Sequence, residues 1–263
     1  TQTPMNELMK TSIAIASLLL LQPGMASAQK MVQENAEPEK ITSGYQFTEG
    51  PVWHPSGYLL FSDIPANTIY KWTPGSDTKT YLSPSGHSNG LTYDQQGRLV
   101  LVQHDGALAR YSEETGVETL VDSYRGKRLN SPNDLTIHSD GSIYFTDPPF
   151  GVSKEEKMLE INGVYRYSVE KGLQLLSDDF DLPNGVALSP DETRLYVNDS
   201  KHKPIRVFEI KKDGTLTNGQ LFAKMESDAP GGADGMKVDA EGNVYSTGPG
   251  GLWIFSAEGE LLQ

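Results

Sequence analysis

Short apolar stretches separated by polar turns recur along most of the chain after residue 40. The repeated pattern includes stretches in which apolar and polar side chains alternate, with the period of two that is typical of half-buried β-strands. Residues 91–93 and 99–102, for example, flank the turn Gln95-Gln96-Gly97 and predict a β-hairpin. The repeated stretches lack the 3.6-residue period of an amphipathic helix. The pattern therefore predicts an all-β protein built from hairpins.

One unit is repeated five times at intervals of roughly 40 to 50 residues, the period of β-propeller blades. Each copy has a polar residue followed by Gly, Pro or Asp, then a first strand, a hairpin turn, and a second and third strand. The copies begin at Glu49-Gly50-Pro51, Ser88-Asn89-Gly90, Pro132-Asn133-Asp134, Pro183-Asn184-Gly185 and Ala233-Asp234-Gly235. A solenoid or a sandwich can also be built from hairpins, but the long regular period favours closure into a ring.

The N-terminal segment differs from the repeats. Lys10 precedes an apolar run over residues 13–21, and Ala26-Ser27-Ala28 forms a small-x-small cleavage pattern, so residues 1–28 are predicted to be a signal peptide cleaved after Ala28. The apolar run is too short for a bilayer, which needs roughly twenty residues. We expect a periplasmic or secreted protein with an extension over residues 29–40 and a propeller domain over residues 41–263.

The count of blades is a separate expectation. Residues 41–47 are strand-like ahead of the first repeat, and residues 259–263 stand where a further strand should continue. We expect a six-bladed β-propeller whose last blade is incomplete in this chain and is shared between its two ends.

Composition narrows the choice of partner. The formal net charge of −13 opposes binding to nucleic acid or to an anionic membrane, which leaves a small molecule as the expected partner. The absence of cysteine excludes disulfides and thiolate metal sites. The oligomeric state is not determined by these features.

A side-chain oxygen precedes the first strand in every repeat. The five residues are Glu49, Asn89, Asn133, Asn184 and Asp234. Because the innermost strand of each blade lines the central channel, they should converge at one mouth. Carboxylate and amide oxygens suit a hard cation, Ca²⁺ before Mg²⁺, with Zn²⁺ and Mn²⁺ as further alternatives. The alternative is that these Asn-Gly and Asp-Gly pairs are only turn dipeptides.

A second set of polar residues follows fourteen or fifteen positions later, where the returning strand should reach the same mouth. The set is Asp63, His104, Asp147 and Asp199. We expect these residues to surround the cation or to contact the substrate. For each of them, a strand-end side chain in solvent is an equally good interpretation.

Five motifs occur in one order along nearly the whole mature chain: Glu49-Gly50-Pro51, residues 129–134 (LNSPND), residues 144–149 (YFTDPP), residues 182–187 (LPNGVA) and Asp234-Gly235-Met236. They resemble the gluconolactonase / senescence-marker-protein-30 / luciferin-regenerating-enzyme family, and in particular its bacterial gluconolactonase type. The resemblance implies a six-bladed propeller with one catalytic divalent ion. It implies Glu49, Asn184 and Asp234 as ligands, Asn133 as ligand or substrate contact, and Asp234 also as general base.

Two departures from the family pattern concern substrate recognition and the end of the chain. Ser131 stands where senescence-marker-type members have Arg, and the nearest arginine is Arg128, which becomes a candidate substrate contact. The family's final segment is not found in this sequence.

These observations lead to the hypothesis of calcium-dependent hydrolysis of a sugar lactone by metal-activated water. Asn89, His104 and Asn133 would orient the lactone, with Asp147, Asp199 and Arg128 as further substrate contacts. The alternatives are a metal-dependent phosphotriesterase or fluorophosphatase, and a calcium-binding propeller without enzymatic activity.

A serine hydrolase is a further alternative, because Gly86-His87-Ser88-Asn89-Gly90 matches G-x-S-x-G. It is disfavoured, since a predicted strand follows the serine where that motif requires a helix.

Overall fold

The computed structural model describes residues 39–217 and 219–263, and regular structure in these residues consists of β-strands. The predicted signal peptide and residues 29–38 of the predicted extension lie outside the described residues. Within the described part of the chain, no helix has the length and apolar character needed to cross a membrane.

The strands form five successive antiparallel sheets, called blades 1 to 5 here. Blade 1 contains β1 (Thr48–His54), β2 (Tyr58–Asp63), β3 (Thr68–Trp72) and β4 (Lys79–Leu82). Blade 2 contains β5 (Ser88–Tyr93), β6 (Leu99–Gln103), β7 (Ala107–Ser112) and β8 (Gly116–Val121). Blade 3 contains β11 (Leu135–Ile137), β12 (Ile143–Asp147), β13 (Gly163–Ser168) and β14 (Gly172–Ser177). Blade 4 contains β15 (Pro183–Leu188), β16 (Arg194–Asp199), β17 (Pro204–Glu209) and β18 (Gln220–Lys224). Blade 5 contains β19 (Met236–Val238), β20 (Val244–Gly248) and β21 (Gly251–Phe255), and a two-stranded ribbon, β9 (Ser123–Tyr124) and β10 (Lys127–Arg128), lies between blades 2 and 3.

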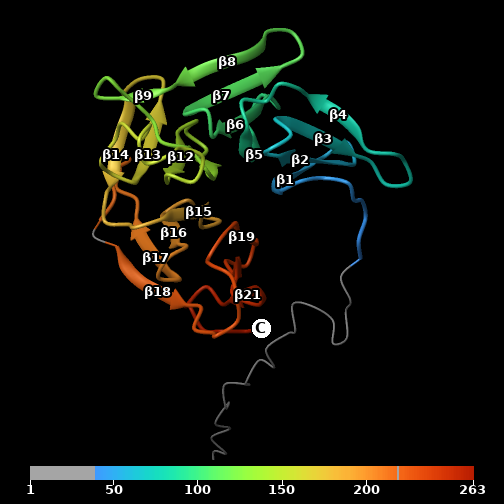
Figure 1. Ribbon diagram of the computed structural model, residues 1–263. Coiled ribbons are helices and arrows are strands. Elements are labelled where there is room, and N and C mark those ends of the chain that lie inside the picture. The colour runs from blue at the N-terminus through green and yellow to red at the C-terminus, as the bar shows by residue number, and fades with distance from the viewer. Residues whose placement is uncertain (1–38, 218) are drawn as a thin grey trace, which may run out of the picture.

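The blades follow one another around a common axis, with the first strand of each blade innermost (Figure 1). The innermost strands pack in sequence: β1 against β5, β5 against β11, β11 against β15, and β15 against β19. The prediction of an all-β propeller of repeated hairpins is therefore confirmed.

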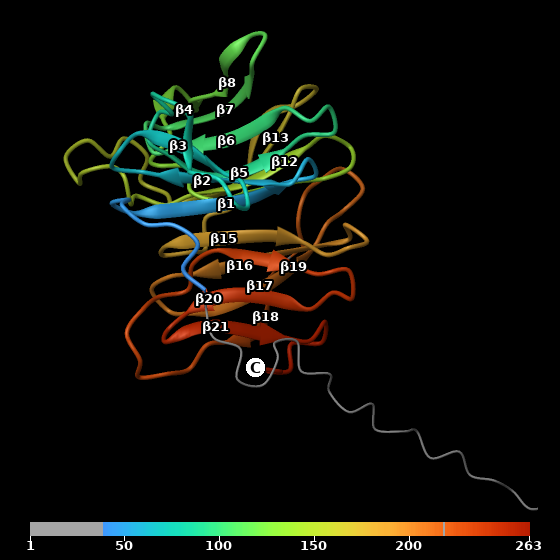
Figure 2. The same ribbon diagram turned by 90° about the vertical axis from the view of Figure 1, so that its right-hand side faces the viewer.

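The expected sixth blade is not present in the described residues. Blades 1 and 5 stand as separate stacks (Figure 2), and a cavity of about 380 Å³ between them is lined by residues from β1 and from β19–β21. Residues 41–47, predicted as a strand, are irregular. The backbone N–H groups of Gln46 and Phe47 donate to the Asp63 carboxylate, at 3.0 and 3.1 Å, and so are not part of a strand ladder.

The hydrophobic core is divided among the contacts between neighbouring blades. Each of four buried clusters draws side chains from two successive blades. Between blades 1 and 2, for example, Leu60 and Ile69 pack with Leu91, Leu99 and Leu101. Central strands such as β6 and β12 are buried along their whole length because both faces of a blade meet another blade, and the axis is left to the polar ends of the innermost strands.

A β-bulge aims the start of the innermost strand at the axis. The register of β1, β5 and β15 shifts between Glu49 and Val52, Ser88 and Leu91, and Pro183 and Val186. A bulge adds a residue to one strand and turns the neighbouring side chains away from the regular alternation. The Glu-Gly and Asn-Gly pairs thus lie inside strands and are not turn dipeptides.

Glycine is required within the bulge because the blades approach closely there. A Cβ on Gly90 would lie 2.9 Å from the carbonyl oxygen of Asn133 in the next blade, and a Cβ on Gly185 would collide with the carbonyl oxygen of Asp234. The missing side chain lets successive innermost strands meet at the axis.

Buried polar side chains near the ends of the second strands tie each blade to the next. Ser62 Oγ donates to the carbonyl oxygen of Asn89 at 2.8 Å, Thr146 Oγ1 to that of Asn184 at 2.6 Å, and Asn198 Nδ2 to that of Asp234 at 2.6 Å. Each acceptor belongs to a residue that begins the following blade. These bonds hold three axial residues at fixed positions.

We expect Thr146→Val to lower the free energy of unfolding by about 1 to 3 kcal/mol, because the change keeps the shape but leaves the buried Asn184 carbonyl without its hydroxyl donor. Urea unfolding followed by circular dichroism measures the change. Thr119→Val, at an exposed position of the outer strand β8, is the matched control. Equal losses in the two variants would contradict this role of Thr146.

Candidate active site

All five oxygen-bearing residues that begin the repeats meet at one mouth of the axis. Glu49, Asn89, Asn133, Asn184 and Asp234 line a cavity of about 460 Å³. The same five also line the cavity between blades 1 and 5. They therefore form a ring, called the axial ring here, at the boundary between the two cavities.

The walls of the mouth cavity combine polar and apolar side chains. His104 and Ser200 lie beside the axial ring, and Phe47, Ile64, Pro65 and Phe150 complete the outer wall. The side chains of Phe47 and Phe150 are 56 and 44% exposed. The cavity thus has a polar floor and a largely apolar entrance, which is typical of small-molecule sites.

The amides of the axial ring form a directed hydrogen-bond chain. Asn89 Nδ2 donates to Asn133 Oδ1 at 2.7 Å, and Asn133 Nδ2 donates to Asn184 Oδ1 at 2.6 Å. The Nε2 atom of His104 lies 3.3 Å from both Asn89 Nδ2 and Asn133 Oδ1. Burial lowers the pKa of His104, which favours its neutral form. Each group thereby restricts the orientation of its neighbour.

The carboxylates of the axial ring are crowded and shielded from water. Burial, followed by the charges of Asp234 and Asp134, raises the pKa of Glu49 to about 7. Burial is also the main cause that raises the pKa of Asp234, against the hydrogen bond from Asn184. Among the described residues that line the mouth cavity, none is Lys or Arg. The site therefore concentrates negative charge without a protein cation beside it.

This donor set fits a hard divalent cation. Within residues 39–217 and 219–263, no group of three or more His, Cys, Asp and Glu side chains is arranged to hold a metal ion. The axial ring has a different composition, because amide oxygens stand beside its two carboxylates. Carboxylate and amide oxygens are the ligands that Ca²⁺ accepts in flexible geometry.

Asp134 is a third acid near the ring that the sequence pattern did not single out. It follows Asn133 at the position where the other four repeats have glycine. Its Oδ2 accepts a hydrogen bond from Val186 N at 3.1 Å and its Oδ1 one from Leu135 N at 2.9 Å, so it also joins blades 3 and 4. The replacement of a repeated glycine by an acid was the signal that could have revealed it.

Three acids predicted near the substrate lie elsewhere. Asp63, Asp147 and Asp199 are at most 3% exposed and do not line the mouth cavity. Asp199 accepts four backbone N–H groups, from residues 181, 182, 201 and 202, at 2.8 to 3.1 Å. Asp147 accepts the N–H of Asn130 at 2.9 Å. Asp147 and Asp199 were predicted to contact the substrate, but in the structure both carboxylates hold the loop that enters their blade.

The prediction of this second set missed the cavity-facing position by one residue in the repeats of Asp63 and Asp199. Asp63 and Asp199 each pair with the first residue of a register in their blade, Thr48 and Pro183. In blade 2 the residue paired in this way, with Ser88, is Gln103. Gln103, and not His104, is therefore the equivalent of these acids. A shift of one residue moves a side chain to the other face of a strand. The next positions, Ile64, His104 and Ser200, are the ones that face the mouth cavity.

Arg128 also lies outside the lining of the mouth cavity. Its guanidinium donates to the carbonyl oxygens of Leu129, Asn130 and His104 at 2.8 to 3.1 Å. The arginine predicted as a substrate contact therefore supports the backbone under His104.

The serine-hydrolase alternative does not agree with the geometry. Ser88 is fully buried within β5, and its Oγ lies 2.9 Å from Ser62 Oγ. It lines neither cavity at the axis and lies inside a strand, where a nucleophile elbow needs the start of a helix.

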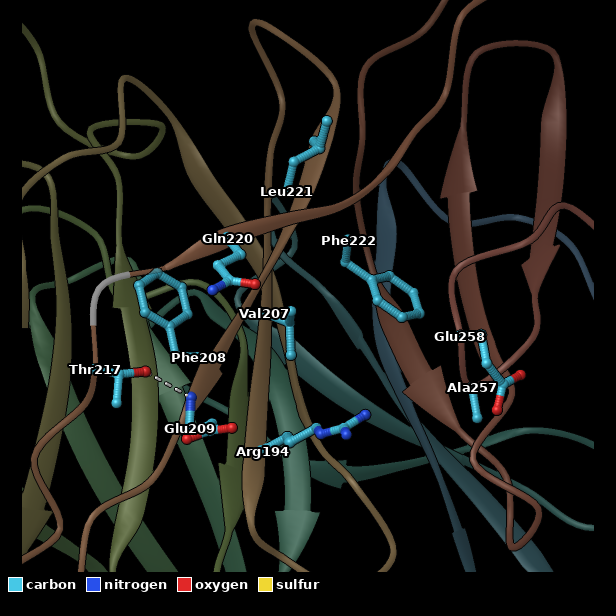
Figure 3. Close-up of a pocket in the computed structure, with 10 residues that line it drawn as sticks. All are labelled: Arg194, Val207, Phe208, Glu209, Thr217, Gln220, Leu221, Phe222, Ala257 and Glu258. Carbon is cyan, nitrogen blue, oxygen red and sulfur yellow. Dashed lines mark hydrogen bonds between the residues drawn. The ribbon is translucent and has the colours of Figure 1, made fainter.

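A further cavity lies far from the axial ring, at the outer edge of blades 4 and 5 (Figure 3). Arg194, Glu209 and Glu258 contribute exposed charges to it, and Thr217 Oγ1 accepts a hydrogen bond from Glu209 N at 3.0 Å. These charged groups are solvated, in contrast to the crowded acids at the axis. The mouth cavity is therefore the candidate active site.

The fold and the site together define the class of this protein: a β-propeller with carboxylate and amide oxygens gathered at one mouth of its axis. The chain belongs to the SMP-30/Gluconolactonase/LRE-like family, whose pattern matches residues 47–263. The family resemblance of the sequence motifs is thereby confirmed.

Individual relatives include proteins named as lactonases. The chain is 38% identical over 251 residues to a gluconolactonase of Zymomonas mobilis, covering 85% of this chain and 70% of that protein. A solved gluconolactonase structure from Xanthomonas campestris matches with a TM-score of 0.75 at 34% identity, over 83% of this chain and 75% of the other. A diisopropyl-fluorophosphatase of Loligo vulgaris is 23% identical over 245 residues, covering 84% of this chain and 78% of that protein.

The buried Asp147 should make stability depend on pH. Burial raises its pKa from 3.8 to about 7 in the folded protein. Ionisation then favours the unfolded chain as the pH rises from about 4 to about 7, and the effect is constant above that range. We expect Asp147→Asn, which can still accept the Asn130 N–H, to gain stability relative to the wild type across this window. Urea midpoints measured from pH 4 to 8 test this, and parallel curves for the two proteins would contradict it.

Proposed function

We propose that this protein hydrolyses a lactone in the mouth cavity with the help of a divalent cation at the axial ring. The observation that carries the proposal is the convergence of two crowded carboxylates and three amides on the floor of an open cavity whose described lining has no Lys or Arg. The named lactonases among its relatives support the same reaction class.

Glu49, Asn184 and Asp234 would hold the cation, with Asn133 as a fourth ligand or a substrate contact. We propose Ca²⁺ first, because the oxygen donors come from different blades and need not reach strict octahedral geometry. When bound, such an ion supplies Lewis-acid polarisation of the lactone carbonyl.

The residues around the ring would prepare the attack on that carbonyl. Asp234, which lines the mouth cavity, would accept the proton of the attacking water. Asn89 and His104 would donate or accept hydrogen bonds to the lactone oxygens. The apolar entrance formed by Phe47 and Phe150 would limit access of bulk water once the substrate fills the cavity.

The substrate is proposed to be a sugar lactone similar to gluconolactone. With Arg128 and Asp147 engaged by backbone groups, recognition of its hydroxyls would depend on Asn89, His104 and Asn133. If the predicted signal peptide is cleaved as proposed, this hydrolysis takes place in the periplasm or outside the cell.

Hydrolysis of phosphotriesters or fluorophosphates is the second candidate activity. The diisopropyl-fluorophosphatase relative supports it, and the apolar entrance of the cavity would suit an alkyl phosphoester. A calcium-binding propeller without activity is supported less, because an open cavity lies directly above the axial ring.

We expect Asp234→Asn to lower kcat/KM for glucono-1,5-lactone by about 10² to 10⁴, the usual contribution of a general base, with a further loss if cation binding weakens. A pH-stat assay follows the release of acid. Asp228→Asn, an exposed aspartate in the same inter-blade loop, should keep wild-type activity. Wild-type turnover by Asp234→Asn would reject the assignment.

Removal of divalent ions with EDTA should abolish lactone hydrolysis, and addition of Ca²⁺ should restore it. The test compares Ca²⁺, Mg²⁺, Mn²⁺ and Zn²⁺ with a panel of aldonolactones and with diisopropyl fluorophosphate. Faster turnover of the fluorophosphate would favour the second activity. Full activity after complete metal removal would exclude a cation-dependent mechanism.

A further inference from the structure

Ser200 lies directly after β16 and lines the mouth cavity between Asn184 and the chain that leads to Asp234. Its Oγ accepts a hydrogen bond from Asn184 Nδ2 at 3.0 Å and donates one to the carbonyl oxygen of Ala233 at 2.6 Å. One hydroxyl therefore connects the ring residue of blade 4 to the residue that precedes the ring residue of blade 5.

The direction of these two bonds determines the orientation of the Asn184 amide. The single hydroxyl proton of Ser200 is used by the Ala233 carbonyl, so Oγ can offer Asn184 only a lone pair. A flipped amide would place Oδ1 against the lone pairs of Ser200 Oγ and would turn Nδ2 toward the donating Nδ2 of Asn133. The nitrogen therefore stays on this side, and Oδ1 faces Asn133 within the ring.

The Ser200 hydroxyl is itself held in place. Its backbone N–H donates to the carbonyl oxygen of Leu182 at 2.9 Å. A Cβ on Gly232 would lie 2.7 Å from the carbonyl oxygen of Ser200, so the loop ahead of Asp234 passes in close contact. Ala233, whose carbonyl oxygen accepts the hydrogen bond from the Ser200 hydroxyl, is 1% exposed. The hydrogen bonds that Ser200 Oγ makes with Asn184 and Ala233 are therefore held in a fixed geometry.

The equivalent positions of two other blades show why a polar side chain is needed here. The backbone N–H groups of Ile64 and His104 donate to Phe47 and His87 in the way that Ser200 donates to Leu182. Ile64 stands next to Glu49, whose two carboxylate oxygens are chemically alike and need no orientation. His104 and Ser200 stand next to amides, which have an oxygen end and a nitrogen end.

We propose that Ser200 is a positioning residue of the cation site, which fixes the Asn184 amide with Oδ1 presented to the axis and links that amide to the loop bearing Asp234. This inference rests on the proposed function, in which a divalent cation binds at the axial ring. Hydrogen-bond partners behind a metal ligand typically change metal affinity by about 10- to 100-fold when they are removed.

Calcium titration of the metal-free full chain by isothermal calorimetry tests the proposal without an activity readout. We expect Ser200→Ala to weaken Ca²⁺ binding by about 10- to 100-fold and Ser200→Thr, which keeps the hydroxyl, to bind within about 3-fold of the wild type. Ser189→Ala is the matched control, because Ser189 also bridges groups within blade 4 but does so at the turn that connects β15 and β16. Urea midpoints confirm that each variant is folded under the titration conditions.

A double-mutant cycle with Asn184→Ala separates orientation of the amide from a general structural effect. If Ser200 acts through Asn184, Ser200→Ala should weaken binding little further in the Asn184→Ala background. Additive losses would overturn the inference, as would wild-type affinity of Ser200→Ala. Parallel titrations of the wild type with Mg²⁺, Mn²⁺ and Zn²⁺ test the proposed function itself. If the wild type binds none of the four cations, the inference and the proposed function both fail, whereas additive losses in a wild type that binds Ca²⁺ overturn the inference alone.

Discussion

The close approach of successive innermost strands at the axis is the constraint on which the rest of this structure depends. Apart from that of Glu49, the carbonyl oxygen of each axial residue is packed against the glycine of the preceding blade or bonded to a polar side chain near the end of that blade's second strand. Because these contacts are backbone contacts, they place the side chains of the ring independently of which oxygen-bearing residue each repeat carries. The same scaffold can therefore present a carboxylate in one blade and an amide in the next.

Much of this arrangement could be predicted from the sequence, because it follows from a repeat. The interval between Asn89, Asn133 and Asn184 predicted the blades, and their place ahead of an apolar strand predicted convergence at the axis. The second set failed because Asp63, Asp147 and Asp199 share one position in the repeat, and the side chain there faces the loop that enters the blade. A count of residues reaches the strand end but does not determine which face a side chain takes. Asp147 and His104 illustrate this: His104 lies one position further along its repeat than Asp147, and only His104 reaches the cavity.

The contacts made by polar side chains could not be predicted in the same way. Arg128, Asp147 and Asp199 are all charged, yet each is bound mainly to backbone groups of loops. Such partners depend on the path of irregular segments, which carry no periodic signal. The number of blades is equally non-local, because each blade makes contacts with its neighbours and no single repeat encodes the size of the ring.

The directed chain of amides in the axial ring has a consequence for how substitutions there will combine. Asn89 donates to Asn133, and Asn133 donates to Asn184, so neighbouring amide dipoles in the series constrain each other's orientation. Polarisation along such a series is cooperative, and reversal of the Asn133 amide puts like ends in contact at both of its neighbours. An aspartate introduced at Asn133 would remove the only donor to Asn184 Oδ1 in this series and add negative charge beside Glu49 and Asp234. The three amides should accordingly behave as one electrostatic unit, in which the effect of any one substitution depends on the other two.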